Sequence, residues 1–303
     1  MTPVTQLLAL PPCPPEEADA IVLPVPLEQT VSYGPGTSGG PAAILAASGQ
    51  VELFDEETGV DFEEAPRIHT AAALMPSDSL EANLAAVQAA TGRFRNKFVL
   101  TLGGEHTLSL GAVAGLCENL DRLTIVQIDA HADLIDQLDG RKVSHGTVMR
   151  RLWERGARLL QLGVRSLSRE EFELISTGER VRTFFAHQLP DRFDEALDTL
   201  GRLEGDVYLS MDIDGLDSSV VPSTGTPQPD GLSWRQTMAI LRAVASAPQA
   251  RLLGADLVEF VPSPHPPGCD LTAAKLAVKT LAWWHVGRGN GPVPLPAEGD
   301  SPP

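Results

Sequence analysis

The alternation of short apolar runs with longer helical segments restricts the fold more than any other feature of this chain. Six runs rich in apolar and β-branched residues have the length of strands, at residues 20–25, 97–102, 123–128, 159–164, 206–210 and 251–260. Unbroken apolar runs of this kind are typical of strands that are covered on both faces, as in a parallel sheet. Between and after the strands, apolar spacing predicts helices at 80–90, 148–155, 194–203, 233–245 and 272–284, and Ser233 is the expected N-cap of the fourth. The pattern therefore predicts a doubly wound α/β fold with helices on both faces of the sheet.

No linker, low-complexity block or internal repeat divides the chain, so we expect a single domain over residues 1–286. Residues 287–303 are rich in proline and glycine and show no apolar period, and we expect this tail to be disordered. The proline-rich residues 11–17 should be extended or disordered for the same reason.

Composition excludes several classes of function. The chain has 23 Lys and Arg against 40 Asp and Glu, a net charge of −17, which argues against binding to nucleic acid or an anionic membrane and favours a cationic ligand. No apolar run approaches the roughly 20 residues that span a bilayer, and the proline-broken N-terminus does not resemble a signal peptide. Three cysteines without C-x-x-C spacing suit a reducing compartment. We therefore expect a cytoplasmic protein.

Acidic and histidine side chains follow three of the predicted strands. The sequence D-A-H-A-D follows the strand at 123–128, M-D-I-D follows that at 206–210, and G-G-E-H follows that at 97–102. In a doubly wound fold these strand ends meet at one edge of the sheet. The side chains that could bind metal there are His106, Asp129, His131, Asp133, Asp212 and Asp214.

This set of ligands predicts a metal centre. Carboxylate and imidazole groups suit manganese, iron(II), cobalt, nickel or zinc, whereas the lack of thiolate argues against a structural zinc. Four carboxylates could not all stay ionised at one place without cations, and six ligands fit two ions better than one. A lone Asp after a strand is usually a turn former, and His106 alone would more often be a hydrogen-bonded core histidine. The D-A-H-A-D combination favours a metal site over a turn or a helix cap, because capping requires no histidine between two acids.

Several motifs occur in the order found in the ureohydrolases, the arginase and agmatinase family. They are GGEHTLSLG, DAHADL, SHGTVMRR, SMDIDGLDSS, GTP and ADLVEF, and the resemblance extends from about residue 32 to residue 281. The chain most resembles the agmatinase branch. The resemblance implies a three-layer α/β/α domain with a central, mostly parallel eight-stranded sheet and a homotrimer or homohexamer. It also implies two Mn²⁺ ions per chain and hydrolysis of a guanidinium group to urea and an amine.

The resemblance also implies a role for each matching residue. One metal would be bound by His106, Asp129, Asp133 and Asp212, and the other by His131, Asp129, Asp212 and Asp214, so that Asp129 and Asp212 bridge. The resemblance assigns the proton shuttle to His145, the carboxylate that pairs with the substrate guanidinium to Glu259, and a threonine of the substrate pocket to Thr226.

Elementary chemistry supports these roles. A guanidinium is a poor electrophile, and two neighbouring metals can lower the pKa of a bridging water from about 16 towards neutrality to supply a metal-bridging hydroxide. Glu259 could accept two parallel N–H bonds from a planar cation, and Asp133 could carry a proton to the leaving amine. His145 could relay protons to bulk water, and the alternative role for this residue is to cap a helix beginning near residue 147.

Loop composition favours agmatine as the substrate, with urea and putrescine as products and a role in polyamine biosynthesis. Arginase-like members hold an α-carboxylate with an Asn- and Ser-bearing loop, whereas residues 134–143 contain neither. Asp136 and Asp139 in this stretch would suit a second positive charge, while Arg141 and Lys142 would suit a carboxylate. Aminopropylagmatine, guanidinobutyrate and arginine therefore remain alternatives.

Three departures from the family pattern affect loops rather than ligands: Glu105 where many relatives have Asp, Ser218 where Pro is common, and Cys269 with Asp270 near the last helix. Two other classes of protein remain open. One is a catalytically silent regulatory relative, and the other is a zinc deacetylase of related fold, which predicts one metal per chain.

Overall fold

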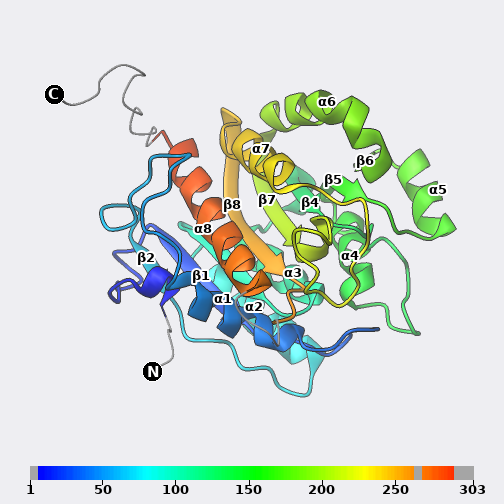
Figure 1. Ribbon diagram of the computed structural model, residues 1–303. Helices are drawn as coiled ribbons and strands as arrows, with labels where there is room; N and C mark the ends of the chain where they lie inside the picture. The colour runs from blue at the N-terminus through cyan, green and yellow to red at the C-terminus, as the bar shows by residue number, and fades with distance from the viewer. Residues whose placement is uncertain (1–5, 263–267, 290–303) are drawn as a thin grey trace.

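The computed structural model describes residues 6–262 and 268–289 and has at its centre an eight-stranded sheet (Figure 1). The strand order is β2-β1-β3-β8-β7-β4-β5-β6, and every neighbouring pair runs parallel. The strands are β1 (Ala20–Val25), β2 (Ile68–Thr70), β3 (Phe98–Gly103), β4 (Leu123–Ile128), β5 (Arg158–Val164), β6 (Val181–Phe185), β7 (Glu204–Asp212) and β8 (Gln249–Val258).

Helices cover both faces of the sheet. They are α1 (Gly40–Ser48), α2 (Leu80–Gly92), α3 (Ser109–Leu116), α4 (Val148–Glu154), α5 (Arg169–Thr177), α6 (Leu189–Gly201), α7 (Trp234–Ala245) and α8 (Cys269–Gly287). Side chains of α1, α6, α7 and α8 form one apolar core with the sheet, and those of α2, α3, α4 and α5 pack into a second core on its other side. Figure 1 shows α7 and α8 crossing in front of the strands. The predicted three-layer α/β/α architecture is confirmed, and the sheet is parallel throughout.

All six predicted strands are present, and the central ones are buried on both faces. The strand predicted at 251–260 ends at Val258, because Glu259 adopts a positive φ of 61° that breaks the extended conformation. The two strands that the sequence did not predict lie at the sheet edges: β2 has three residues, and β6 is partly exposed. Neither forms the continuous apolar run used to find the others.

Four of the five predicted helices begin within three residues of the expected position, and Ser233 caps α7 as predicted by accepting from the Gln236 amide. The fifth, α6, begins at Leu189 rather than at 194. Helices α1, α3 and α5 were not predicted. The first two consist mainly of small and apolar residues and lack a polar stripe, so their sequences carry no amphipathic period.

Residues 11–17 contain neither helix nor strand, but residues 15–17 form a turn, in which the Glu17 amide donates to Pro14 O, rather than the expected extended chain. The predicted tail lies mostly outside the described residues, since the description ends at residue 289. None of the helices in the described part of the chain combines the length and apolar character needed to cross a bilayer.

Strand order decides where the polar motifs meet. Strands β3, β8, β7 and β4 are consecutive in the middle of the sheet, although they are far apart in sequence. Their carboxyl ends lie at the same edge because all four run parallel. In open α/β sheets this edge is where ligands bind.

Candidate active site

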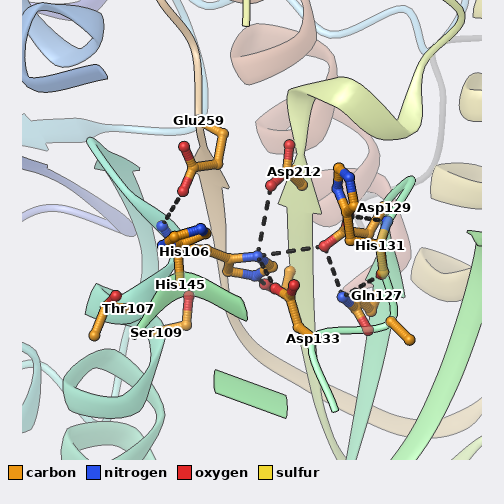
Figure 2. A network of polar contacts seen from close by, with 12 residues as sticks. His106, Thr107, Ser109, Gln127, Asp129, His131, Asp133, His145, Asp212 and Glu259 are labelled. Atoms are coloured by element: carbon orange, nitrogen blue, oxygen red, sulfur yellow. Dashed lines mark hydrogen bonds and ion pairs between the residues drawn. The ribbon is translucent and has the colours of Figure 1, made fainter. Parts of the chain in front are cut away.

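Each of the four central strands delivers polar side chains to this edge. His106 opens a short 3₁₀ helix just after β3, and the D-A-H-A-D segment follows β4 directly. Asp212 is the last residue of β7, and Glu259 comes immediately after β8. Figure 2 shows these side chains converging from their separate strands. The structure thus brings together all six residues that the sequence predicted as metal ligands.

The His106 ring lies at the centre of the first group of ligands. Its Nδ1 atom lies 2.9 Å from Asp133 Oδ2, 3.3 Å from Asp129 Oδ2 and 3.6 Å from Asp212 Oδ2 (Figure 2). The ring is buried, and Nδ1 makes no hydrogen bond of acceptable geometry despite these neighbours. A buried nitrogen that faces three carboxylates from three directions fits a shared cation better than it fits a hydrogen bond.

The other ring nitrogen of His106 is held by a buried hydrogen-bond chain. His106 Nε2 lies 2.8 Å from Ser210 Oγ, and Ser210 Oγ donates to Asp256 Oδ1 at 2.8 Å. Because the only hydroxyl proton of Ser210 goes to Asp256, Nε2 must be the N–H donor to Ser210. In the neutral ring Nδ1 then keeps its lone pair, which is the form of histidine that binds a metal. In the metal-free chain, burial lowers the pKa of His106, but its contacts with Asp129 and Asp133 and the charges of these carboxylates raise it well above its usual value.

His131 forms a second group with Asp214 and Asp129. Its Nδ1 atom lies 3.0 Å from Asp214 Oδ2 and 3.6 Å from Asp129 Oδ1. Ligand atoms of His106, Asp129 and Asp212 all lie within 4.8 Å of one another, as do those of Asp129, His131 and Asp214. The chain therefore has two groups that could each hold a metal ion. Asp129 belongs to both, whereas Asp212 belongs only to the first.

Three backbone hydrogen bonds and a glutamine also hold the aspartates, and one of these backbone bonds runs from the His131 amide to Asp129 Oδ1 at 2.6 Å. Gln127 Nε2 donates to Asp129 Oδ2 at 2.7 Å, and the Ala130 amide donates to Asp214 Oδ1 at 3.0 Å. The Asp214 amide donates to Asp212 Oδ1 at 2.9 Å. These contacts fix the carboxylates before any ligand binds.

The charged side chains of the site lie so close together that they shift one another's pKa values. Burial opposes protonation of His131, but hydrogen bonds to Asp129 and Asp214 raise its pKa to about 11. Burial and the charge of Asp129 raise the pKa of Asp133 to about 7. Burial and the charges of Asp214 and Asp129 raise the pKa of Asp212 well above its usual value. Protons thus neutralise part of the negative charge that bound divalent cations would neutralise.

Two of the candidate residues have strained backbones. Asp133 has a φ of 53° and Glu259 a φ of 61°, conformations that cost non-glycine residues free energy. The strain is held by backbone hydrogen bonds, from the Arg150 amide to Asp133 O and from the Glu259 amide to Gly104 O. In both cases the turn directs a carboxylate back over the end of the sheet.

The remaining predicted residues line a cavity of about 280 Å³ beside the metal ligands. His145, Thr226 and Glu259 all contribute to its wall. Glu259 Oε1 accepts from the His106 amide at 2.7 Å, and Thr226 Oγ1 donates to Asp214 Oδ2 at 3.3 Å. Burial raises the pKa of Glu259 to about 8, aided by the charges of Glu105 and Asp214.

The acidic residues suggested for a second positive charge lie away from the cavity wall. Asp136 forms an ion pair with Arg151 at 2.7 Å, and neither it nor Asp139 lines the cavity. Arg141 donates to Gln29 O at 3.0 Å and lies outside the cavity wall as well. The loop folds so that its apolar residues, Ile135 and Leu138, face the cavity instead.

Glu171 lines the cavity, and the sequence alone did not single it out. It is buried, and its two oxygens accept from the amides of Leu134 at 2.8 Å and Ser168 at 2.6 Å. It forms a capping box with Ser168 at the start of α5. The S-x-x-E spacing was visible in the sequence, but it marks a helix start and does not show what the helix start faces.

Comparison with known proteins agrees with this fold and identifies the family. The model of the Arginase family matches residues 18–282. The chain belongs to the arginase family. It is 33% identical over 279 residues to an N(1)-aminopropylagmatine ureohydrolase of Synechocystis sp., covering 88% of this chain and 90% of that protein. An agmatinase of Bacillus anthracis is 29% identical over 276 residues, or 89% and 93% of the two chains. The crystal structure of the agmatine ureohydrolase of Thermoplasma volcanium superimposes with a TM-score of 0.83 at 27% identity, covering 92% of this chain and 94% of that one.

Membership confirms the predicted family, its agmatinase branch and the arginase-like fold. It also confirms that the chain is an enzyme, a hydrolase of the ureohydrolase type. The roles of individual side chains and the choice of guanidino substrate stay predictions.

Proposed function

We propose that this enzyme hydrolyses the guanidinium group of agmatine to urea and putrescine with two Mn²⁺ ions. The observation that carries the proposal is the placement of Glu259. Its carboxylate lies on the cavity wall beside both groups of metal ligands, where a planar cation bound to it would sit over the candidate metal centre.

Two divalent ions bound here would lower the pKa of water at the site and so supply hydroxide at neutral pH. One ion would be held by His106, Asp129, Asp133 and Asp212, and the other by His131, Asp129 and Asp214. Asp212 is also assigned to the second ion, although its ligand atoms group with those of His106 in this structure. The chain offers oxygen and imidazole ligands without thiolate among them, which favours Mn²⁺ over structural zinc.

Glu259 binds and orients the guanidinium. One of its oxygens already accepts from the His106 amide, and no other side chain or amide in residues 6–262 and 268–289 donates to this carboxylate, which leaves the remaining lone pairs for substrate N–H groups. A guanidinium beside it favours the charged form of Glu259 and lowers its pKa from about 8. Thr226, on the same wall, limits the space around the planar group.

Asp133 and His145 move protons. Asp133 lies against His106 at the cavity, where it would take the proton released as hydroxide adds to the guanidinium carbon and give it to the leaving amine. His145 exchanges protons with bulk water at the mouth. Burial lowers the pKa of His145, so the ring is mostly neutral at pH 7 and can accept a proton.

The part of the cavity away from the metal ligands indicates how long a substrate could bind. Ile135, Leu138 and Leu167 form an apolar stretch that suits methylene groups, and Glu171 supplies a carboxylate for a distal ammonium. Both features fit agmatine. They also fit aminopropylagmatine, and that second candidate is favoured by the named activity of the Synechocystis relative, which shares more of this sequence than the agmatinase of Bacillus anthracis does.

A substrate panel tests the proposal. The full chain loaded with Mn²⁺ should release urea from agmatine or aminopropylagmatine, and much more slowly from arginine and guanidinobutyrate. Glu259→Gln keeps the size of the side chain and should abolish urea release while two metal ions per chain remain bound. Urea release from none of the four compounds would contradict the proposal, and one metal per chain would favour the deacetylase alternative.

We also propose that residues 1–286 form one catalytic domain that acts in polyamine biosynthesis in the cytoplasm, as a homotrimer or homohexamer. The small cationic guanidino substrate is its expected ligand, with no nucleic acid or membrane partner. Sedimentation of the purified chain would measure the assembly state directly.

A further inference from the structure

Glu105 fastens a loop of the cavity mouth to the end of β3. The side chain is fully buried, and its Oε2 atom accepts from the amides of Gln29 and Thr30, each at 2.6 Å. Its Oε1 atom accepts from Thr30 Oγ1 at 2.9 Å. The same loop continues through Ser32, which lines the cavity. A carboxylate has about four acceptor sites, so this one buried side chain can accept from all three donors.

Thr30 connects this carboxylate to His145, which lies 115 residues further along the chain. Thr30 Oγ1 lies 3.0 Å from the His145 backbone nitrogen and 3.3 Å from His145 Nδ1. The Thr107 hydroxyl also contacts Thr30 Oγ1, at 3.1 Å. The threonine hydroxyl is therefore the meeting point of Glu105, Thr107 and His145.

Counting protons assigns the direction of these bonds. A hydroxyl has one proton, and the charged acceptor Glu105 attracts that of Thr30 more strongly than a neutral acceptor would. The two lone pairs of Thr30 Oγ1 then accept from the His145 amide and from one of two further neighbours, Thr107 Oγ1 or His145 Nδ1. A His145 Nδ1 that bonds to Thr30 can do so only as an N–H group. The other ring nitrogen, Nε2, lies 3.3 Å from Ser32 Oγ and faces the cavity.

We propose that Glu105 and Thr30 are positioning residues that hold His145 in its Nδ1–H tautomer, with the lone pair of Nε2 directed into the cavity. The inference rests on the proposed function in one respect, namely that His145 transfers protons during hydrolysis. Neither residue touches the reacting atoms. They act by deciding which nitrogen of His145 can accept a proton from that side.

The tautomer matters because the ring is neutral when it accepts. A neutral imidazole has one acceptor nitrogen, and if the proton sat on Nε2 the ring would present an N–H group to the cavity. The ring would then have to rotate or exchange its proton before each transfer. The His145 amide donates to the same hydroxyl, so removal of the Thr30 hydroxyl frees the backbone of His145 as well as its ring.

Substitutions at Thr30 test the proposal by kinetics. Thr30→Val keeps the shape and removes the hydroxyl, and in the Mn²⁺-loaded chain we expect kcat for urea release to fall about 10-fold to 100-fold with little change in KM. Thr30→Ser keeps the hydroxyl and should restore most of kcat. Thr91→Val removes a buried hydroxyl of α2 that donates to Val87 O, and it should behave like the wild type.

A spectroscopic measurement tests the tautomer without using activity. With ¹⁵N-labelled histidine and Zn²⁺ as a diamagnetic ion, long-range ¹H–¹⁵N correlation spectra distinguish protonated from unprotonated ring nitrogens, and His145→Asn identifies the signal. The wild type should show a protonated Nδ1, and Thr30→Val should show a mixture of tautomers.

Three results would overturn the proposal: an unchanged kcat in Thr30→Val, an equal loss in Thr30→Ser and Thr30→Val, or a wild-type His145 protonated at Nε2. If the wild type releases no urea from any guanidino compound, the proposed function fails. The spectra still decide the assignment of the tautomer in that case.

Discussion

The orientation of the His106 ring depends on two residues that would bind no metal themselves. Ser210 accepts from His106 Nε2, and Asp256 accepts from Ser210. Asp256 also accepts from Tyr208 at 2.8 Å and from Ser109 at 2.6 Å, so its carboxylate is fixed from several sides. Partners of this kind orient a ligating histidine and raise its basicity.

Removal of the Ser210 hydroxyl should therefore weaken metal binding. We expect Ser210→Ala to lower the affinity for Mn²⁺ by about 10-fold to 100-fold, because the ring loses the acceptor that fixes its tautomer. Competition with a chelator of known affinity measures the effect. Ser176→Ala, which removes an exposed hydroxyl of α5, is the matched control. An affinity equal to that of the wild type would show that Ser210 does not orient His106.

At the scale of elements, the ends of β4 and β7 approach each other more closely than side chains normally allow. Gly215 closes the 3₁₀ helix that follows β7 and carries Asp214. A Cβ atom at this position would lie 2.7 Å from the Asp129 amide nitrogen and 2.8 Å from the Ile128 carbonyl carbon. The lack of a side chain at residue 215 thus permits two ligand-bearing strand ends to pack together.

We expect Gly215→Ala to destabilise the fold by about 1–3 kcal/mol, because backbone atoms cannot move aside as a flexible side chain can. Thermal unfolding of the metal-free chain measures this cost. Gly201→Ala, at the end of α6, is a control in which the new Cβ meets nothing within 4 Å and should be neutral or slightly stabilising. Equal melting temperatures for Gly215→Ala and the control would contradict the packing argument.

At the scale of the whole molecule, the chain carries a net charge of −17. Four of its acidic side chains, at the ends of β4 and β7, are buried together at the candidate metal centre. In the metal-free state, protons on His131 and Asp133 offset part of this charge. Both groups hold protons more tightly in the folded chain than in the unfolded chain. The stability of the metal-free fold should therefore fall as pH rises.

The pH range follows from the two pKa values. The stability that the proton on Asp133 adds is lost as pH rises from about 4, its unfolded pKa, to about 7, its folded pKa. The stability that the proton on His131 adds is lost between about pH 6.5 and about pH 11. Divalent ions replace these protons, so the increase in melting temperature on adding Mn²⁺ should be larger at about pH 9 than at about pH 6. Calorimetric scans with Mn²⁺ and with a chelator measure the difference. A metal effect that shrinks as pH rises would contradict this assignment of protons.

The sequence by itself determined the fold class and the residues that gather at the sheet edge. Continuous apolar strands require a parallel sheet, and residues that directly follow such strands must lie at its carboxyl edge. For this reason the amino-acid order alone was enough to place His106, the D-A-H-A-D segment and Asp212 together. Two elements lack the pattern of apolar residues from which the others were predicted. Edge strand β6 is only partly buried, so it has no continuous apolar run. Helix α3 is almost fully buried, so it has no polar face to give a helical period.

Only the tertiary structure decided which side chains support and surround the site. Asp256 reaches Ser109 across 147 residues, and Thr30 reaches His145 across 115. These contacts depend on the strand order β3-β8-β7-β4 and on the loop that crosses the cavity mouth. The same holds for Asp136, which pairs with Arg151 on α4 and leaves the cavity wall to apolar residues. Local sequence sets the period of an element, whereas a contact between distant segments exists only after their elements have packed.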